Sequence, residues 1–256
     1  MRALLEDLKG KRALVTGSST GIGAAVAREL GRLGVAVAVH GNRNAEAAEA
    51  VAAEIRAAGG KAVVVLGDVS NSASAARIVA DAVAGLGGLD ILINNAGAIL
   101  DRVTNAAFDD AAYDKVYDLN VRSVLAVTKA AYPHLKAAGG GSIINTGSVA
   151  GRFGGFGGSA VYASAKAAVH SITRNAAREF AADHIRVNVV APGFIITPFH
   201  DKTPQSVKDS AAAQIPMQRL GTAEDCVGAY IFLAADSMSG YITGQIIDVN
   251  GGQLMP

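Results

Sequence analysis

Short aliphatic runs alternate with Ala-rich, helix-length spacers from one end of the 256-residue chain to the other. The runs show little polar alternation, which is typical of strands buried on both faces of a parallel sheet, and the spacers imply right-handed crossovers. The predicted strands cover residues 12–16, 35–39, 62–66, 90–94, 142–146, 186–190 and 245–249. The sequence therefore predicts an α/β fold with a doubly wound, seven-stranded parallel sheet flanked by helices.

The spacers predict six helices within a single domain. They cover residues 22–33, 44–58, 72–86, 113–137, 161–182 and 222–235. Pro133 lacks a backbone donor, so we expect it to bend or interrupt the fourth helix. Neither a Pro/Ser-rich linker nor a block of like charges divides the chain, and we therefore expect residues 1–256 to form one domain.

The composition bears on which partners the protein binds and on where in the cell it is found. With 23 basic and 22 acidic residues, the chain lacks the charge excess of a nucleic-acid-binding protein. No apolar run approaches the ~20 residues that cross a bilayer, and the acidic start lacks the apolar core of a secretory signal. The single cysteine, Cys226, and five scattered histidines show no metal-ligand spacing. We expect a cytoplasmic protein without nucleic-acid, membrane or metal partners.

A glycine-rich turn joins the first predicted strand to the first predicted helix. Its sequence, TGSSTGIG over residues 16–23, allows the backbone to approach a pyrophosphate, and free N–H groups at the helix start attract the anion. An ordinary Gly-rich turn is the alternative, but the strand-turn-helix context favours a dinucleotide site. The candidate residues are Gly17, Ser19, Thr20, Gly21, Ile22 and Gly23.

Two more candidate segments follow the third and fourth predicted strands. Asp68 stands where a carboxylate can accept a hydrogen bond from an adenine amino group, or can instead cap the next helix. The run NNAG over residues 94–97 lets the backbone approach the adenosine ribose, or forms a turn in which Asn94 ties neighbouring strands together. The candidate cofactor contacts are Asp68, Val69, Asn95, Ala96 and Gly97.

Tyr162 and Lys166 give the sharpest chemical signal. A separation of four residues at the head of a predicted helix places both side chains on one face, about 5–6 Å apart at Cβ. An ammonium beside a phenol stabilises the phenolate, so we expect Lys166 to lower the pKa of Tyr162 from about 10 toward neutrality. A chance surface pair is the alternative.

Ser148 and Asn120 add two polar side chains to the same region. Ser148 follows the fifth predicted strand, at the carboxyl edge where ligands of such sheets bind, and its hydroxyl can hold a substrate oxygen. Asn120 is a poor helix former inside the predicted helix 113–137, so we expect it to bind a water or a backbone carbonyl beside the site.

In these features the chain resembles the short-chain dehydrogenase/reductase family over essentially its whole length. The matching segments are TGxxxGIG at 16–23, Asp68-Val69, NNAG at 94–97, Asn120, Ser148, YxxxK at 162–166, RVNxxxPG at 186–193 with Thr197, and GxxxDVxGG at 244–252. The resemblance implies a single Rossmann-type NAD(P)-binding domain. It also implies a homo-oligomer, most often a homotetramer.

For the site, the resemblance implies a role for each matched residue. Tyr162 would transfer the proton, and Ser148 would hold the substrate oxygen. Lys166 would bind the nicotinamide ribose and tune Tyr162, with Asn120 supporting a water-mediated proton relay. Tyr162 and Lys166 are thus cofactor contacts as well. The residues expected at the nicotinamide carboxamide are Pro192, Gly193, Ile195 and Thr197.

We expect a small-molecule substrate with a carbonyl or alcohol group, and three functions are compatible with the sequence. The resemblance favours a 3-oxoacyl-[acyl-carrier-protein] reductase, with a sugar or polyol dehydrogenase close behind. A catalytically silent dinucleotide sensor would normally lack the tyrosine or the lysine, and both are present. One extra residue between Ser148 and Tyr162, in the Gly-rich segment 151–158, limits transfer of a substrate from relatives. Residues 194–216 are expected to form a substrate flap.

The turn after the second predicted strand bears on the choice of cofactor. NAD-dependent enzymes usually carry a carboxylate there, but Gly41 occupies that position. Asn42 and Arg43 follow, and the Arg43 fork can pair with a 2′-phosphate, with possible hydrogen bonds from Ser18, Ser19 and His40. Thr20 stands where many NADP-dependent relatives have a basic residue. We expect NADP to be preferred, with NAD as the alternative.

Overall fold

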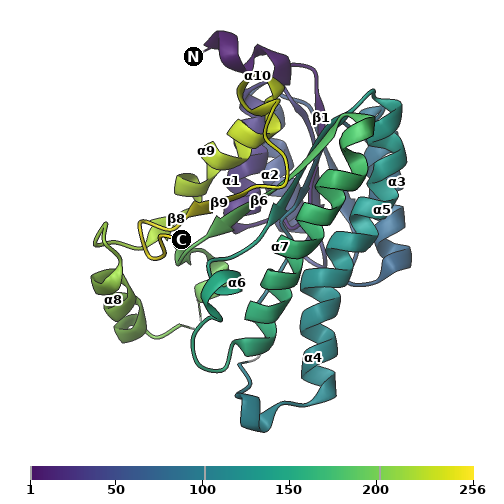
Figure 1. The fold of residues 1–256 in the computed structure, drawn as a ribbon. Helices are drawn as coiled ribbons and strands as arrows, with labels where there is room; N and C mark the ends of the chain where they lie inside the picture. Colours follow the sequence, from purple (N-terminus) through teal and green to yellow (C-terminus); the bar gives the residue numbers. More distant parts are fainter. Residues whose placement is uncertain (1, 101, 202) are drawn as a thin grey trace.

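A computed structural model describes residues 2–100, 102–201 and 203–256 and shows one parallel sheet of seven strands (Figure 1). The strand order is β3-β2-β1-β4-β5-β6-β9. The bounds are β1 (Arg12–Val15), β2 (Ala36–Gly41), β3 (Ala62–Leu66), β4 (Ile91–Asn94), β5 (Gly141–Thr146), β6 (Ile185–Pro192) and β9 (Ile246–Val249). All seven predicted strands are present, and the predicted single-domain, Rossmann-type fold is confirmed.

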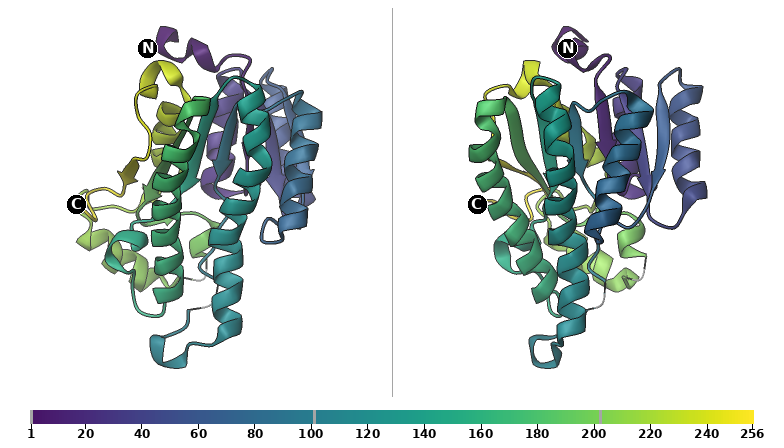
Figure 2. Two further views of the ribbon diagram at one scale, coloured as in Figure 1. Left: turned by 45° about the vertical axis from the view of Figure 1, so that its right-hand side comes forward. Right: turned by 90° about the vertical axis from the view of Figure 1, so that its right-hand side faces the viewer.

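Helices cover both faces of the sheet (Figure 2). The α-helices are α1 (Gly21–Arg32), α2 (Ala45–Ala57), α3 (Ser72–Leu86), α4 (Asp110–Tyr117), α5 (Ser123–Ala137), α6 (Ala150–Phe153), α7 (Ala160–Phe180), α8 (Gln205–Gln214), α9 (Ala223–Ala234) and α10 (Asp236–Ser239). Short 3₁₀ turns are η1 (Arg2–Leu8), η2 (Asn105–Ala107), η4 (Ala181–Asp183) and η5 (Pro198–His200).

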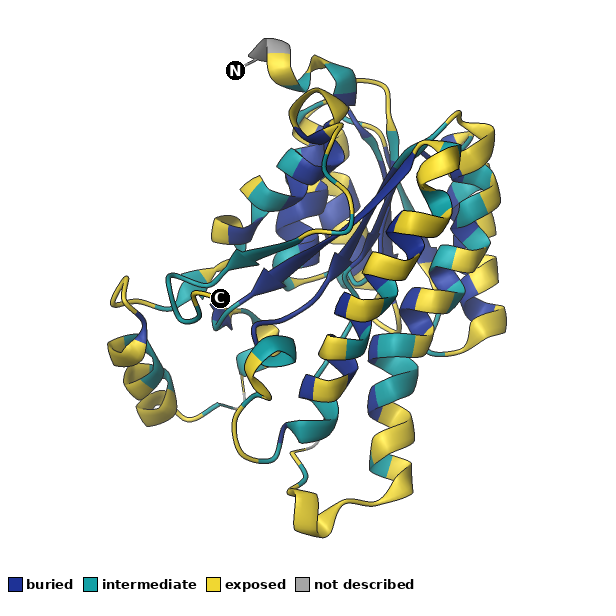
Figure 3. Ribbon diagram, in the orientation of Figure 1, coloured by how far each residue is buried: buried dark blue, intermediate teal, exposed yellow. Residues whose placement is uncertain are grey.

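Each face of the sheet has its own apolar core. Buried residues of α1, α2 and α9 pack on one face, and those of α3, α5 and α7 pack on the other. The alternating strand residues Ala13, Leu14 and Val15 divide between these two cores, so β1 is buried on both sides (Figure 3). Each fully buried aliphatic side chain contributes about 1.5–3 kcal/mol of transfer free energy. This packing fixes the strand ends from which the site is built.

The structure corrects the predicted helix over residues 113–137. A π-helical turn, η3 (Asp118–Arg122), separates α4 from α5, whereas Pro133 lies inside α5 without interrupting it. A π turn inserts one extra residue into an α-helix and is common at functional positions. An insertion of one residue changes the helical repeat too little to be recognised from the sequence pattern. The break in the helix is therefore located at Asn120 and not at Pro133.

The sequence did not predict the small elements that follow β6. A second, two-stranded parallel sheet pairs β7 (Ile195–Ile196) with β8 (Gly221–Thr222), and α8 lies between them. Two-residue strands are too short to show a period in the sequence. With α4 and α6, α8 lies at the carboxyl ends of the large sheet, in the lower part of Figure 1. These connections therefore lie at the same end of the sheet as the carboxyl ends of its strands.

Candidate active site

A cavity of about 360 Å³ opens at the carboxyl edge of the sheet. Its walls come from the glycine turn after β1 and from the segments that follow β2, β3, β4, β5 and β6. Strand β1 lies between β2 and β4, so the crossovers run in opposite directions from this point, as in other doubly wound sheets that bind ligands. The cavity therefore lies at the topological switch point.

Most of the predicted site residues line this cavity. They are Gly17, Ser19, Thr20, Gly21, Ile22, Asn42, Val69, Asn95, Ala96, Gly97, Ser148, Tyr162, Lys166, Pro192, Gly193, Ile195 and Thr197. Gly23, Arg43, Asp68 and Asn120 are not among its lining residues. The sequence did not single out several further lining residues: Ala98, Leu119, Thr146, Gly147 and Pro198.

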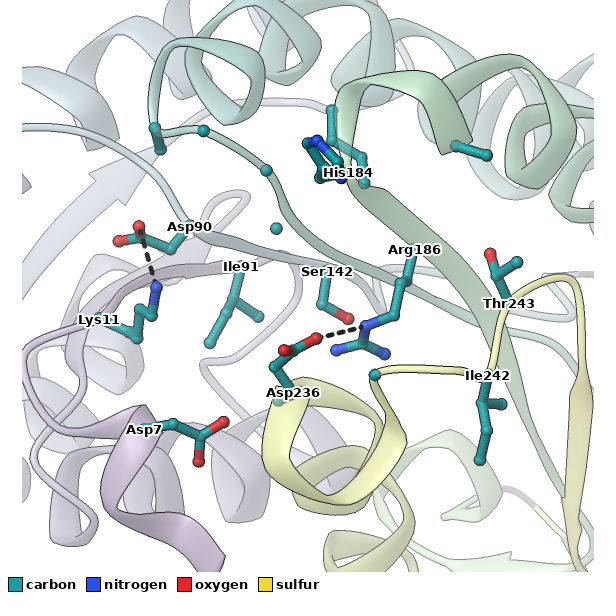
Figure 4. Close-up of a pocket in the computed structure, with 18 of the residues that line it drawn as sticks. Asp7, Lys11, Asp90, Ile91, Ser142, His184, Arg186, Asp236, Ile242 and Thr243 are labelled. Atoms are coloured by element: carbon teal, nitrogen blue, oxygen red, sulfur yellow. Dashed lines mark ion pairs between the residues drawn. The ribbon is translucent and has the colours of Figure 1, made fainter.

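A larger cavity, of about 860 Å³, lies at the opposite, amino edge of the sheet (Figure 4). Its charged side chains largely pair with one another: Lys11 Nζ lies 3.8 Å from Asp90, and Arg186 Nε lies 3.4 Å from Asp236. None of the predicted site residues lines it. Size alone would point to this cavity, but the chemically informative side chains lie in the smaller one.

The glycine turn has the shape of a phosphate cradle. Gly17 and Gly21 have φ of +64° and +57°, in the region that side chains disfavour. A Cβ on Gly17 would stand 2.9 Å from Ala96 Cα, and one on Gly23 would stand 2.5 Å from Gly17 O. In the described structure the Thr20 side chain makes no capping hydrogen bond to α1. The positive end of this helix is therefore open to the cavity, which Thr20 and Gly21 line. This arrangement fits a pyrophosphate.

The two asparagines after β4 have different roles. Asn95 Nδ2 donates to the carbonyls of Thr16 and Gly17 at 3.0 and 3.1 Å, which fixes the glycine turn against the end of β4. Asn94 Nδ2 donates to Asn145 Oδ1 at 2.8 Å and thereby joins β4 to β5. Asn94 therefore ties neighbouring strands together, as one of the two sequence interpretations proposed.

Asp68 does not cap α3. That cap is Asn71, whose side chain accepts a hydrogen bond from Ser74 N at 2.9 Å. Asp68 Oδ1 accepts from the backbone and hydroxyl of Ser70, at 2.9 and 2.7 Å. The N-cap alternative is therefore wrong, and adenine contact by Asp68 stays a prediction.

Tyr162 lies in the first turn of α7 and points into the cavity with Lys166 one turn later. Lys166 Nζ is 5.7 Å from the centre of the Tyr162 ring and donates to Thr146 O at 2.9 Å. Ser148, two residues beyond β5, accepts from Ala150 N at 3.1 Å, and its side chain acts to lower the pKa of Tyr162. The end of β5 therefore brings the serine, the phenol and the ammonium group together.

Burial dominates the acidity of this pair in the protein. It raises the pKa of Tyr162 to about 12, and the hydrogen bond from Ser148 acts in the opposite direction. Burial also lowers the pKa of Lys166 to about 8. The expectation that Lys166 lowers the pKa of Tyr162 toward neutrality is wrong for the protein alone, because burial of the phenol raises this pKa and only Ser148 acts against it.

Asn120 is fully buried in the π turn. Its Nδ2 donates to Ala98 O at 2.8 Å and to Val116 O at 2.9 Å, so it binds backbone carbonyls as one interpretation expected. Its Oδ1 has no hydrogen-bond partner among the described residues. A Cβ on Gly97 would stand 2.7 Å from this oxygen and 3.1 Å from Lys166 Nζ. The orphaned oxygen and the ammonium group thus both lie beside the same glycine.

Aromatic side chains from η5 close the substrate side of the cavity. The ring centres of Phe199 and Tyr162 are 5.9 Å apart, and His200 packs on Phe194 at 4.1 Å. Burial lowers the pKa of His200 to about 4, with the cations Arg102 and Lys208 acting in the same direction. The η5 side chain that packs on Tyr162 is therefore apolar, and its neighbour His200 is a neutral imidazole.

The turn after β2 is only partly directed into the cavity. Asn42 lines it, whereas Arg43 is exposed. The sequence suggested phosphate contacts from Ser18 and His40, but Ser18 Oγ donates to Val15 O at 2.6 Å, and both ring nitrogens of His40 are hydrogen-bonded within the protein. These two side chains are therefore committed to the fold.

Groups of metal-binding side chains and membrane-spanning helices are two further features that bear on function. Across the residues that the structure describes, no group of three or more His, Cys, Asp or Glu side chains can hold a metal ion. None of the helices in the described ranges is long and apolar enough to cross a bilayer.

Comparison with known proteins places these features in context. Residues 17–253 match a family model described as enoyl-(acyl carrier protein) reductase. The chain is 39% identical to the 3-oxoacyl-[acyl-carrier-protein] reductase FabG of Staphylococcus aureus, over 96% of this chain and 98% of that protein.

Solved structures of other reductases are also similar to this chain. The NADH-dependent reductase A1-R′ responsible for alginate metabolism is 45% identical, with a TM-score of 0.90 over 98% of this chain and 100% of that one, and it has also been solved complexed with NAD. A Serratia marcescens short-chain dehydrogenase/reductase mutant is 36% identical, with a TM-score of 0.90 over 96% and 99% of the two chains.

Proposed function

The chain belongs to the short-chain dehydrogenase/reductase family, and we propose that it reduces a ketone to a secondary alcohol with Tyr162 as the proton donor. It is a nicotinamide-dependent oxidoreductase that acts on CH–OH groups. The main support for these roles is that Ser148, Tyr162 and Lys166 line the same cavity as the glycine turn.

The residues present fit a nicotinamide dinucleotide. The glycines at 17, 21 and 23 leave room that a Cβ would fill, and the uncapped start of α1 suits its pyrophosphate. Pro192, Gly193, Ile195 and Thr197 would hold the carboxamide end, and Lys166 would hold the ribose. When bound, the cofactor supplies or accepts the hydride at the substrate carbon.

The protein's own residues handle the oxygen and the proton. The Ser148 hydroxyl orients the substrate oxygen, and the Tyr162 phenol donates its proton to that oxygen as the carbonyl is reduced. A tyrosine whose pKa is about 12 keeps its proton at pH 7, which is the state required of a donor. The protonated phenol can therefore serve as the proton donor when the carbonyl is reduced.

Reprotonation of Tyr162 needs a path to solvent, and Asn120 supports one. Its Oδ1, which has no partner among the described residues, and the Lys166 ammonium both lie beside Gly97, at 2.7 and 3.1 Å from the position of a hypothetical Cβ. A water held between these groups would connect Lys166 to the π turn. Buried polar atoms normally find such a partner, so the orphaned oxygen supports this role.

For the substrate we propose a 3-oxoacyl thioester, with a sugar-derived ketone as the second candidate. The S. aureus relative, named a 3-oxoacyl-[acyl-carrier-protein] reductase, supports the first, and the 45% identical reductase named for alginate metabolism supports the second. Residues 194–216 would form the flap that selects between them: α8 has no buried residue, and Phe199 packs on Tyr162. Lys202, within this range, lies outside the described residues.

An absorbance assay at 340 nm separates the two substrates. Purified protein is given acetoacetyl thioesters and a panel of sugar-derived ketones, with NADPH and NADH in parallel reactions. Turnover of the thioesters is the expected result. Activity confined to the sugar-derived ketones would replace the first candidate with the second, and no activity on either would refute the proposed reduction.

We propose NADP as the preferred cofactor, with NAD as the alternative. Gly41 offers no carboxylate to repel a 2′-phosphate, Asn42 lines the cavity, and the exposed Arg43 is free to turn toward the phosphate. The NADH-dependent relative is the finding that favours the alternative.

We also propose a cytoplasmic homotetramer. The edge strand β9 is only partly buried, and α5 and α7 carry small residues that allow another helix to approach closely. The small residues that are not buried within the chain are Ala126, Ala130, Ala167 and Ala168, whereas Ala131 and Ala163 are buried in it. Light scattering at micromolar concentration should give a mass near four times 25.9 kDa, and a monomeric mass would refute the proposal.

A further inference from the structure

His40 is buried in the wall of the cavity, with 1% of its surface exposed. It lies near the end of β2 and joins the ends of three neighbouring strands. Gly17 N, after β1, donates to its Nδ1 at 2.9 Å, and its Nε2 lies 3.0 Å from Gly67 O, after β3. Its backbone N–H also donates to Ser18 Oγ at 2.8 Å.

These two contacts fix the protonation of the ring. The Gly17 N–H can only donate, so Nδ1 must be unprotonated, and the Gly67 carbonyl can only accept, so Nε2 must carry the proton. Burial lowers the pKa of His40, although Gly67 O and the charge of Asp68 act in the opposite direction. A single neutral tautomer therefore satisfies both hydrogen bonds.

On one side, the imidazole determines where the glycine turn lies. Gly17 has a φ of +64°, its N–H is held by His40, and its carbonyl is held by Asn95 Nδ2 at 3.1 Å. A Cβ on Gly23 would stand 2.5 Å from Gly17 O, so the start of α1 packs directly on this peptide. A shift of Gly17 would therefore move the N–H groups that face the pyrophosphate.

On the other side, the imidazole holds the segment that follows β3. Gly67 O accepts from Nε2, and Gly67 N donates to Gly41 O at 3.1 Å. Two residues later, Val69 lines the cavity. The ring thus spans the gap between the phosphate cradle and the wall expected to contact the adenine.

We propose that His40 is a positioning residue for cofactor binding, whose neutral imidazole holds the glycine turn and the end of β3 at a fixed separation. It acts through Gly17 and Gly67, since neither ring nitrogen is left to bond the cofactor. This inference rests on the proposed function, because it takes the occupant of the cavity to be a nicotinamide dinucleotide.

Two substitutions separate the two hydrogen bonds. In His40→Asn, the amide oxygen can take the place of Nδ1 and accept from Gly17, while the bond to Gly67 is lost. In His40→Gln, the amide nitrogen can take the place of Nε2 and donate to Gly67, while the partly buried Gly17 N–H loses its partner. His134→Gln, on α5 and remote from the cavity, is the matched control.

Binding of NADPH and of NADH is measured by fluorescence titration without substrate, and kcat and KM follow from steady-state assays. We expect His40→Gln to raise the Kd of the preferred cofactor about tenfold, the effect of leaving one partly buried donor unpaired, with kcat within about twofold of wild type. His40→Asn should stay within about threefold of wild type, and His134→Gln should match it.

Each outcome decides a different claim. If His40→Gln binds both cofactors as tightly as wild type, or lowers kcat without changing affinity, the positioning role is refuted. If wild type itself binds neither cofactor, the proposed function fails first. Selective ¹⁵N-histidine labelling of wild type gives a test that needs no variant: five histidines are observed, and an Nδ1–H tautomer at His40 would overturn the inference.

Discussion

Replacing His170 with Leu should reduce the loss of folding stability in the acid range, while His40 and His200, whose pKa values are also lowered by burial, still contribute to it. His170 lies one turn after Lys166 on α7, is 4% exposed, and its Nε2 has no hydrogen-bond partner among the described residues. A Cβ on Gly147 would stand 2.4 Å from this nitrogen, so the ring fills its site tightly. Burial lowers its pKa to about 4, with Arg152, Lys166 and Arg174 acting in the same direction.

The sign and size follow from the difference between the folded and unfolded pKa. The unfolded chain takes up a proton at His170 below pH 6.5, whereas the folded chain stays neutral there until about pH 4. Stability is therefore complete above pH 6.5 and is lost progressively as the pH falls to 4. At about 1.4 kcal/mol per pH unit, wild type should lose about 3 kcal/mol through this residue by pH 4.5, and His170→Leu should not.

Urea denaturation followed by far-UV circular dichroism suits this chain, which has no tryptophan. The free energy of unfolding is measured for wild type and for His170→Leu at pH 7.5 and pH 4.5, at one protein concentration. Val169→Ala, a buried neighbour on α7, is the control: it should lower stability equally at both values of pH. Equal losses between pH 7.5 and 4.5 in wild type and His170→Leu would refute the reasoning.

Three further predictions concern the site. Lys166→Ala should weaken cofactor binding and lower kcat together, and intact cofactor affinity in a titration would contradict its double role. Arg43→Ala should lower the ratio of kcat/KM for NADPH over NADH about ten- to a hundredfold, the worth of a charge-assisted pair, and an unchanged ratio would exclude phosphate binding by Arg43. Gly97→Ala places a methyl group 2.7 Å from Asn120 Oδ1, so kcat should fall at least about tenfold. Gly157→Ala, where a Cβ meets nothing within 4 Å, should retain wild-type turnover, and equal rates for both variants would argue against the relay.

The sequence predicted the sheet well because its signal is strong. All seven strands are aliphatic runs, the central ones are buried on both faces, and each differs from its predicted bounds by at most two residues. The site residues were found because they follow the carboxyl ends of those strands, where parallel topology brings distant segments together. Tyr162 and Lys166 are on one helix, so their proximity follows from the helical repeat alone.

The features that the sequence did not reveal depend on tertiary contacts. The π turn around Asn120 is coupled to Ala98 O in another segment, and β7 and β8 stabilise each other only when paired. The hydrogen bonds of His40 link three strand ends that lie far apart in the sequence. The raised pKa of Tyr162 results from burial in a cavity whose depth no local pattern encodes.

The central claim is that Tyr162 transfers the proton, and Tyr162→Phe tests it most directly. The variant removes only the phenolic oxygen and leaves the ring that packs against Phe199. Cofactor affinity is measured by fluorescence titration, and turnover is measured with the best ketone substrate found. We expect cofactor affinity close to that of wild type, with kcat lowered by about 10²–10⁴, the contribution of a positioned general acid. Turnover within a few-fold of wild type would contradict the claim.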